Sequence, residues 1–225
     1  DRANRPVNYV SWGDAARFMN WLHNGQPTGA QSWATTEDGA YYLNGAMTTA
    51  ALMAVTRKAD ARYWIPSENE WYKAAYHKND GVTGNYWDYP TGSDSVPSND
   101  LATPDPGNSA NFYQSGYTIG SPYWMTEVGA FTNSESPYGT FDQGGNVWEW
   151  NEAVATATWR GIRGGDYTRD SSRMLASDFA GDDPRYNYYF TGFRVATVPE
   201  PGSLTLMLCG ALAGLFWWWR RSRSG

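Results

Sequence analysis

Residues 139–150 read Gly-Thr-Phe-Asp-Gln-Gly-Gly-Asn-Val-Trp-Glu-Trp, and they are the most informative part of this chain. The paired glycines permit positive φ angles and close backbone approach just before the tryptophans. Trp148 and Trp150 alternate with Glu149, so a strand would place both indoles on one face and the carboxylate on the other. Asp142, Glu149 and the carbonyls of an irregular turn are hard oxygen donors of the kind that calcium takes. The alternative is a tryptophan-rich core strand with an ordinary solvated glutamate.

Further motifs precede and follow this stretch in order. They are Pro6-Val-Asn-Tyr-Val-Ser-Trp-Gly-Asp-Ala-Ala-Arg-Phe-Met-Asn-Trp21, Ile65-Pro-Ser-Glu-Asn-Glu-Trp-Tyr-Lys-Ala-Ala75, Asn108-Ser-Ala-Asn-Phe112, Val128-Gly-Ala-Phe131, Arg163-Gly-Gly-Asp-Tyr167 and Gly192-Phe-Arg-Val195. In this order and spacing they resemble the formylglycine-generating enzyme (sulfatase-modifying factor) family over roughly residues 6–196. The resemblance implies an α+β, C-type-lectin-like fold with little regular secondary structure.

The composition limits the classes of function. A chain of 225 residues can hold one sizeable domain plus an appendage. Residues 198–225 contain three arginines and one glutamate, which leaves 14 basic and 22 acidic residues in 1–197, a net charge of −8. A phosphate backbone requires a basic footprint, so we expect no nucleic-acid partner.

Cysteine and histidine are scarce. Cys209 is the only cysteine and lies in an apolar run, so no intrachain disulfide and no cysteine-based metal site in the soluble part is expected. The two histidines, His23 and His77, follow apparent helices, where a cation suits the last turn. We therefore interpret them as capping or surface residues and expect neither copper nor iron.

The C-terminal tail begins with Val198-Pro-Glu-Pro-Gly-Ser203. Residues 203–219 then carry no charge, and Arg220, Arg221 and Arg223 follow three tryptophans. At about 1.5 Å per residue this apolar run is roughly 25 Å long, close to the minimum that spans a bilayer, which predicts one transmembrane helix with its arginines in the cytoplasm.

The tail resembles a PEP-CTERM sorting signal, with Pro199, Glu200 and Pro201 as its triplet. This resemblance implies export, recognition by an exosortase and cleavage near the triplet. The protein would be anchored in the inner membrane before processing and then reach the cell surface or extracellular matrix. We divide the chain into a domain at 1–197 and a sorting tail at 198–225. No signal peptide is visible at Asp1, so we expect the natural beginning to be missing.

Several helices and strands are predicted from local signals. Ser11 with Asp14, and Ser67 with Glu70, have the spacing of capping boxes, each opening a helix; the first should stop near residues 24–25. Residues 41–45 suit a turn or short strand, and 46–55 could be helical. Residues 63–65, 159–167 and 190–196 are predicted strands. Residues 79–139 are rich in Gly, Pro, Ser, Asn and Asp, and are either disordered or held by ions and side-chain hydrogen bonds.

The family resemblance also assigns site residues. The founding activity uses two cysteines shortly after the Gly-Gly motif, and the matching positions are Arg169 and Met174, neither of which can form a thiolate. A structural calcium would be held at Asp142, Gly145, Val147 and Glu149, with Asp142 replacing an asparagine of the family pattern. A possible second metal site would use Asn111 and Phe112, but Gly120 stands where its carboxylate is expected.

Relatives that keep only the scaffold bind ligands near the C-terminal loops. The corresponding surface here would include Asp166, Tyr167, Arg169, Arg185, Tyr186 and Tyr188, which suit a glycan or peptide; a solvated loop over an aromatic core is the alternative.

We therefore expect an exported, exosortase-sorted protein without the catalytic cysteines, acting as a calcium-stabilised binding or structural module. The alternative is a metal-dependent oxidoreductase of the same superfamily.

Overall fold

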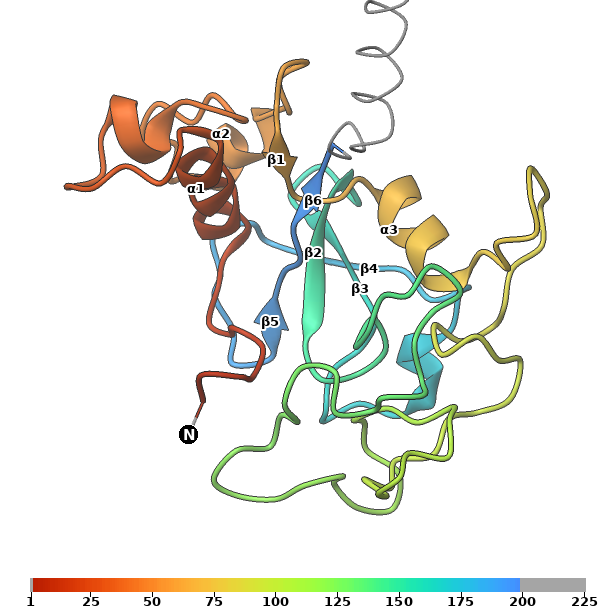
Figure 1. Ribbon diagram of the computed structural model, residues 1–225. Helices are drawn as coiled ribbons and strands as arrows, with labels where there is room; N and C mark the ends of the chain where they lie inside the picture. Colours follow the sequence, from red (N-terminus) through yellow and green to blue (C-terminus); the bar gives the residue numbers. More distant parts are fainter. Residues whose placement is uncertain (1, 199–225) are drawn as a thin grey trace, which may run out of the picture.

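The computed structural model describes residues 2–198 (Figure 1). Along this part of the chain the elements are α1 (Trp12–His23), the π-helix η1 (Trp33–Glu37), α2 (Thr49–Ala54), β1 (Tyr63–Trp64), α3 (Glu68–Tyr76), β2 (Trp148–Val154), β3 (Arg160–Arg163), the 3₁₀ helix η2 (Ser171–Met174), β4 (Ala180–Asp182), β5 (Thr191–Gly192) and β6 (Ala196–Thr197). Most of the remaining described chain is irregular, as the family resemblance implies.

Both predicted capping boxes are confirmed. The Ser11 side chain accepts a hydrogen bond from the Asp14 N–H at 3.0 Å, and the Asp14 carboxylate accepts one from the Ser11 N–H at 3.1 Å. Ser67 and Glu70 form the same reciprocal pair at the start of α3. Each box satisfies main-chain donors that a helix start leaves without partners, which is why both helices begin where predicted.

The other local predictions hold less well. The helix predicted over 46–55 is confined to α2, because Thr48 caps it and accepts the Ala51 N–H at 3.2 Å. Of residues 41–45, only Tyr41 pairs in β fashion, as an isolated bridge to Arg57. The strand predicted over 190–196 is divided into β5 and β6, which belong to different sheets.

The larger sheet has the strand order β4-β3-β2-β5 and is mixed. β2 is antiparallel to β3 and parallel to β5, and its pairing with β3 is irregular between Trp150 and Val154. The smaller sheet joins β1 and β6, whose antiparallel register places Tyr63 opposite Thr197. The end of the described chain thus returns to a strand from its first half (Figure 1).

The main core lies between α1 and the larger sheet. Trp12, Ala15 and Met19 of α1 are fully buried in one cluster with Trp150 and Ile162. The two indoles each find a partner: Trp12 Nε1 donates to the Asn151 carbonyl at 3.1 Å, and Trp150 Nε1 donates to the Val10 carbonyl at 2.9 Å. These bonds allow both tryptophans to bury their rings without leaving an unpaired N–H.

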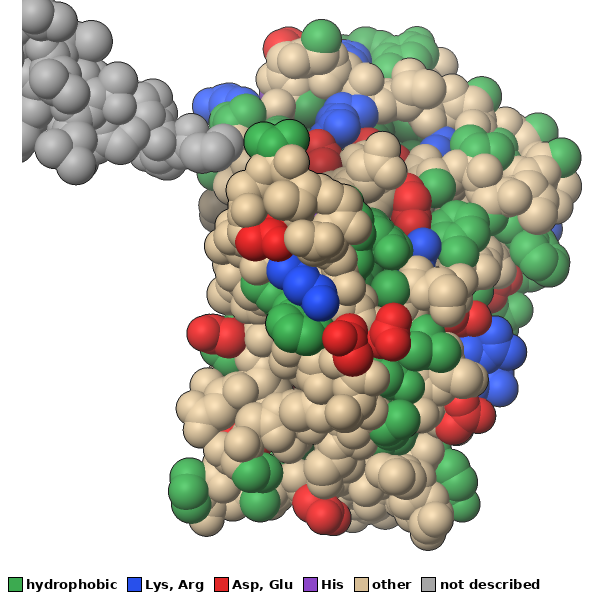
Figure 2. All heavy atoms as spheres, turned by 90° about the vertical axis from the view of Figure 1, so that its right-hand side faces the viewer, with side chains coloured by type: hydrophobic (Ala, Val, Ile, Leu, Met, Phe, Trp, Pro, Cys, Tyr) green, Lys and Arg blue, Asp and Glu red, His purple; other side chains and the backbone are tan. Residues whose placement is uncertain are grey.

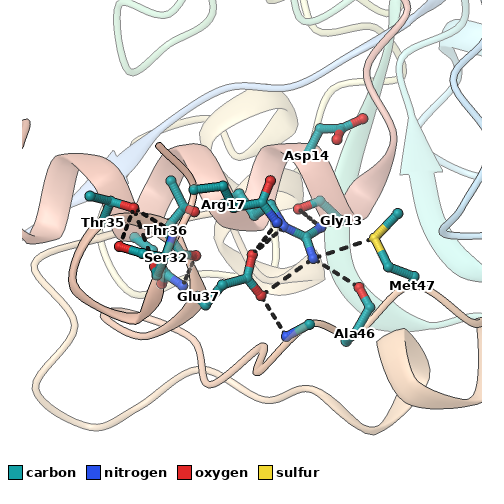
Figure 3. Close-up of polar contacts among 12 residues, drawn as sticks. Gly13, Asp14, Arg17, Ser32, Thr35, Thr36, Glu37, Ala46 and Met47 are labelled. Carbon is teal, nitrogen blue, oxygen red and sulfur yellow. Dashed lines mark hydrogen bonds and ion pairs between the residues drawn. The ribbon is translucent and has the colours of Figure 1, made fainter. Parts of the chain in front are cut away.

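A buried ion pair attaches η1 to α1 (Figure 3). Arg17 Nε donates to Glu37 Oε1 at 2.7 Å, and Arg17 Nη2 donates to the Ala46 carbonyl at 2.9 Å. The other Glu37 oxygen accepts the Gly45 N–H at 2.6 Å. The Glu37 carboxylate therefore connects η1 to α1 and to the loop at Gly45.

Side-chain hydrogen bonds hold residues 79–139, as the second of the two predicted alternatives requires. Asp105 is buried, and its Oδ2 accepts the Asn133 N–H and the Ser134 hydroxyl, both at 2.8 Å. Its Oδ1 accepts the Gly107 N–H at 3.0 Å. One carboxylate therefore connects two distant parts of this long segment.

Acidic, basic and apolar side chains are interspersed on the face of the molecule that carries α3 (Figure 2). None of the helices within residues 2–198 is long and apolar enough to cross a membrane. The transmembrane helix predicted at 203–219 lies outside the described residues.

Candidate functional site

The Gly-Gly-Asn turn before β2 packs directly against two other segments. Gly145 has a φ of +72°, and a Cβ there would lie 2.1 Å from the Asn111 carbonyl oxygen. Its N–H donates to the Gly164 carbonyl at 2.8 Å. Only glycine permits this close approach, so the sequence requirement at 145 is steric.

Asn146 connects the turn to its neighbours. It is 1% exposed, and its Oδ1 accepts bonds from the Thr126 N–H and from Asn111 Nδ2, both at 3.0 Å. Its own N–H donates to the Asn111 carbonyl at 2.7 Å, and its carbonyl accepts the Tyr167 N–H at 3.2 Å. This residue therefore fixes three loops around the start of β2.

Glu149 is buried rather than solvated, so the alternative of an ordinary surface glutamate is wrong. It is 6% exposed, Trp71 Nε1 donates to its Oε2 at 2.6 Å, and Arg194 Nη2 donates to its Oε1 at 2.7 Å. Arg194 Nε donates to Oε2, and Arg194 Nη2 also reaches the Phe141 carbonyl at 3.1 Å. β2 is consequently buried on both faces at Trp148, Glu149 and Trp150.

Asp142 lies near this ion pair. It has a φ of +57°, and its Oδ2 accepts the Gly129 N–H at 2.7 Å. Burial raises the pKa of Asp142, the Gly129 hydrogen bond and Arg194 lower it, and Glu149 raises it again; the net direction is upward. It also lines a cavity of about 10 Å³ with Ser109 and Ser134.

The residues at the first predicted calcium site fit a cation in charge and in donor type. The carboxylates of Asp142 and Glu149 interact in a partly desolvated place, where burial is the main cause that raises the pKa of Asp142. Arg194 already supplies one positive charge to Glu149, so a calcium ion would share this carboxylate with a guanidinium. Among residues 2–198, three or more histidine, cysteine, aspartate or glutamate side chains do not gather into a group that could hold a metal. Calcium at this place would therefore depend on main-chain carbonyls such as those of Gly145 and Val147.

The second predicted metal position contains a buried amide oxygen without a hydrogen-bond partner. Asn111 Oδ1 is buried and has no hydrogen-bond partner, whereas its Nδ2 donates to the Trp124 carbonyl at 3.0 Å. The Phe112 carbonyl accepts Asn99 Nδ2 at 3.3 Å. Gly120, where a carboxylate was expected, is exposed.

The two positions that the resemblance assigns to the family's cysteines lie in different environments. Arg169 is exposed, and its Nε lies 3.8 Å from Asp166 Oδ2. Met174 is 0% exposed and packs in a cluster with Tyr89 and Phe112, and its carbonyl accepts the Tyr76 hydroxyl at 3.0 Å. Position 174 is thus occupied by a core side chain.

The predicted ligand surface divides into exposed and buried members. Arg185, Tyr186 and Tyr188 are exposed, as is Arg169, whereas Tyr167 is mostly buried and Asp166 is fully buried. Burial raises the pKa of Asp166, its bonds to Thr168 lower it, and the net direction is upward. Asp166 therefore supports this surface from beneath and does not form part of it.

Sequence reasoning did not assign roles to Trp71, Asn146 and Arg194. Trp71 and Arg194 lie 78 and 45 residues from Glu149 along the chain. Both residues belong to motifs quoted above, Ile65–Ala75 and Gly192–Val195. Arg194 is the one arginine in these two motifs, and the need of a buried carboxylate for a cationic partner was the signal that could have predicted its pairing with Glu149.

His77, expected at a cap or the surface, is the C-cap of α3 but is buried, and its Nδ1 bonds the Tyr138 hydroxyl at 2.8 Å. The sorting triplet, Pro199 to Pro201, lies outside the described residues.

Comparisons with known proteins agree with this architecture. The model of the sulfatase-modifying factor enzyme 1-like domain family matches residues 1–198, and that of the PEP-CTERM protein-sorting motif matches residues 197–221. No curated protein matches the chain.

Three solved structures share the fold. Variable protein 1 of Treponema denticola is 21% identical with a TM-score of 0.58, over 88% of this chain and 73% of its own. CarF is 20% identical with a TM-score of 0.57, over 87% and 69%. PvdO from Pseudomonas aeruginosa is 17% identical with a TM-score of 0.52, over 86% and 62%.

Proposed function

This chain belongs to the sulfatase-modifying factor enzyme 1-like family and carries a PEP-CTERM sorting motif, and from that premise we propose that it is an exported, calcium-stabilised binding or structural module at the cell surface or in the extracellular matrix. The motif implies export, recognition by an exosortase and processing linked to the membrane. The domain that is exported would then act through the surface it presents.

The replacement of both family cysteines carries this proposal. Arg169 is an exposed cation that cannot act as a thiol nucleophile, and Met174 is a core thioether beneath the surface. The founding oxidation of a substrate cysteine depends on two thiols at these positions. A domain that keeps the scaffold without them is best suited to binding.

Calcium would be held by Asp142, Glu149 and the carbonyls of Gly145 and Val147. When bound, the ion would supply positive charge to two neighbouring carboxylates and would not supply redox chemistry. Stabilisation by an ion that binds only the folded chain grows with its concentration, by about 2.7 kcal/mol when free calcium is about 100 times its Kd.

Thermal unfolding of the full chain in calcium and in chelator tests this proposal. We expect a higher melting temperature in calcium, and we expect Asp142→Ala to abolish the difference. Asp170→Ala is the matched control, because Asp170 also accepts a main-chain N–H, from Ser172 at 2.9 Å, and lies outside the carboxylate pair. Identical melting of the unmodified chain in the two buffers would rule out a stabilising calcium.

A further inference from the structure

The guanidinium of Arg160 is a buried charge without a carboxylate partner. Arg17, Arg163 and Arg194 each form an ion pair with a glutamate. Arg160 is only 3% exposed, yet it pairs with no carboxylate of residues 2–198, and its hydrogen bonds all go to main-chain carbonyls. Because charges that leave water are normally paired, Arg160 differs from these three arginines.

Four main-chain carbonyls explain the position of Arg160. Its Nη2 donates to the carbonyls of Leu52, Met53 and Val55 at the end of α2, at 2.8, 3.2 and 2.6 Å. Its Nη1 donates to the Glu152 carbonyl at 2.8 Å. The last carbonyls of a helix have no partner within it, so Arg160 satisfies them and connects α2 to β2. Carbonyl dipoles solvate a guanidinium, but they do not neutralise its charge.

The charge of Arg160 is incompletely compensated. Its guanidinium carbon lies 4.1 Å from the centre of the Trp12 ring, and its Nε–H has no hydrogen-bond partner. Burial lowers the pKa of Arg160 to about 10, and the negative charge of Glu152 raises it only in part. A cationic N–H without an acceptor in a desolvated place costs free energy, so a further anion nearby would stabilise Arg160.

Arg160 forms part of the wall of a pocket of about 200 Å³. A second cation, Arg57, and one carboxylate, Glu152, also line this pocket. Two cations and one anion give the pocket a net positive charge, although residues 1–197 carry a net charge of −8. The apolar part of the lining includes Met53, Val55 and Val154.

Neighbouring side chains hold Arg57 and Glu152 in place. Arg57 Nη2 lies 3.5 Å from Glu152 Oε2, and Arg57 Nη1 donates to Glu70 Oε1 at 3.2 Å. The Arg57 guanidinium carbon lies 4.7 Å from the centre of the Trp64 ring. The Tyr41 hydroxyl donates to Glu152 Oε1 at 2.6 Å. The charged groups of the pocket are therefore positioned before any ligand arrives, which reduces the entropy lost on binding.

We propose that this pocket binds a small monocarboxylate with a short apolar group. The carboxylate would lie beside the guanidinium groups of Arg160 and Arg57, whose planar N–H donors suit it. The hydrocarbon part would pack against the apolar lining. A volume of about 200 Å³ is below the roughly 300–1,000 Å³ of sites for drug-sized ligands, so the ligand is a small molecule.

The lining favours a monocarboxylate over other small ligands. An amine would meet two arginines, and a neutral alcohol would leave the Arg160 charge uncompensated. Phosphate carries more than one negative charge at neutral pH, so Glu152 would repel it more strongly, and it has no hydrocarbon group for the apolar wall. The inference goes beyond the proposed function, because none of the predicted calcium positions lines the pocket.

Calorimetric titration of the full chain in chelator with butyrate and benzoate tests the proposal, with 1-butanol, butylamine and inorganic phosphate as comparison ligands. We expect saturable binding of at least one carboxylate and weaker binding of the other three compounds. Arg57→Met should weaken carboxylate binding about tenfold, because a charge-assisted contact is lost. Glu152→Gln should strengthen it about threefold, since it removes the negative charge of the pocket and keeps an acceptor for the Tyr41 hydroxyl.

The matched control is Arg62→Met, which removes the same charge from an exposed arginine outside the pocket. Arg62 Nη2 also donates to a main-chain carbonyl, that of His23 at 2.8 Å. A second readout requires no variant. The NMR resonance of the Arg160 Nε–H group should shift on carboxylate binding, whereas that of Arg17 Nε–H, which donates to Glu37 at 2.7 Å, should not.

No saturable binding of either carboxylate, equally tight binding of 1-butanol or phosphate, or equal loss in Arg57→Met and Arg62→Met would overturn the proposal. So would carboxylate binding that leaves the Arg160 resonance unchanged. Melting the same samples in calcium and in chelator separates the two proposals. Calcium-dependent melting without carboxylate binding rejects the pocket ligand and leaves the calcium-stabilised module standing. Carboxylate binding to a chain whose melting does not respond to calcium supports the pocket and rejects the structural calcium.

Discussion

The carboxylate of Glu149 accepts hydrogen bonds from two side chains that lie far from it in the sequence. Trp71 belongs to α3 and Arg194 lies between β5 and β6, so this single residue of β2 connects a helix, the larger sheet and the end of the domain. The Glu149 carboxylate, the Trp71 N–H and the Arg194 guanidinium are all partly removed from water. Removing the carboxylate would leave the Arg194 charge and the Trp71 N–H without a partner.

Glu149→Gln should therefore destabilise the domain by about 3 kcal/mol, because the Arg194 charge loses its partner. Urea unfolding at neutral pH measures the change. Glu127→Gln is the matched control: its side chain is 57% exposed and lies 3.9 Å from Arg5, so the expected loss is about 0.5 kcal/mol. Equal losses of unfolding free energy in the two variants would show that the burial of Glu149 does not increase its contribution to stability.

The ion pair between α1 and η1 acts on whole elements (Figure 3). Burial raises the pKa of Glu37, but hydrogen bonds from Arg17, Gly45 and Gln31 and the Arg17 charge outweigh it, so the net pKa is lowered from 4.5. A carboxyl with a lowered folded pKa contributes stability that is present above its unfolded pKa and is lost as pH falls through its folded pKa.

Glu37→Gln should consequently cost about 2–3 kcal/mol at pH 7, where Arg17 loses a charged partner. The difference in unfolding free energy between the variant and the unmodified chain should narrow as pH falls below about 4.5 and through the lowered pKa of Glu37, since the native glutamate then becomes neutral as well. Urea midpoints across this pH range measure the gap. A gap that stays constant with pH would show that the charge of Glu37 does not matter.

The elements that could be predicted from the sequence are those stabilised by near neighbours. α1 and α3 are defined by serine caps three residues from their acidic partners, and β2 by the alternation at 148–150. η1 could not be predicted, because its residues are held by Arg17, by Asn20 Nδ2 on the Thr36 carbonyl and by Asn24 Nδ2 on the Thr35 carbonyl. The division of 190–196 into β5 and β6 likewise depends on partners in two sheets.

The site shows the same division between local and distant information. The interaction of Asp142 with Glu149 follows from their spacing on one turn and strand, and the sequence located both. Arg194 and Trp71 reach Glu149 only through the assembled fold. The positive φ angles of Tyr9 and Trp124 likewise have no sequence signal, because neither residue type favours this conformation.

At the scale of the whole molecule, the β1–β6 pair closes the domain by joining residues 63–64 to 196–197. The Thr197 hydroxyl adds a bond to the Arg62 carbonyl at 2.9 Å. A chain ending at residue 195 should therefore be less stable than one ending at 198 by about 1–2 kcal/mol, the effect of a short ladder and one side-chain bond. Thermal unfolding of the two truncated chains makes the comparison, and equal melting temperatures would show that the pair does not stabilise the domain.

Thr197 is the last residue of β6 and also the first residue matched by the sorting motif. Only Val198 separates it from Pro199, which adds at most about 3.5 Å of reach, so the exported domain and the signal share a boundary without slack. The strand that closes the domain and the matched sorting motif thus share Thr197. A sorting enzyme that binds the motif from its first residue would compete with β1 for Thr197. It would have to bind before β6 pairs with β1 or separate the two strands.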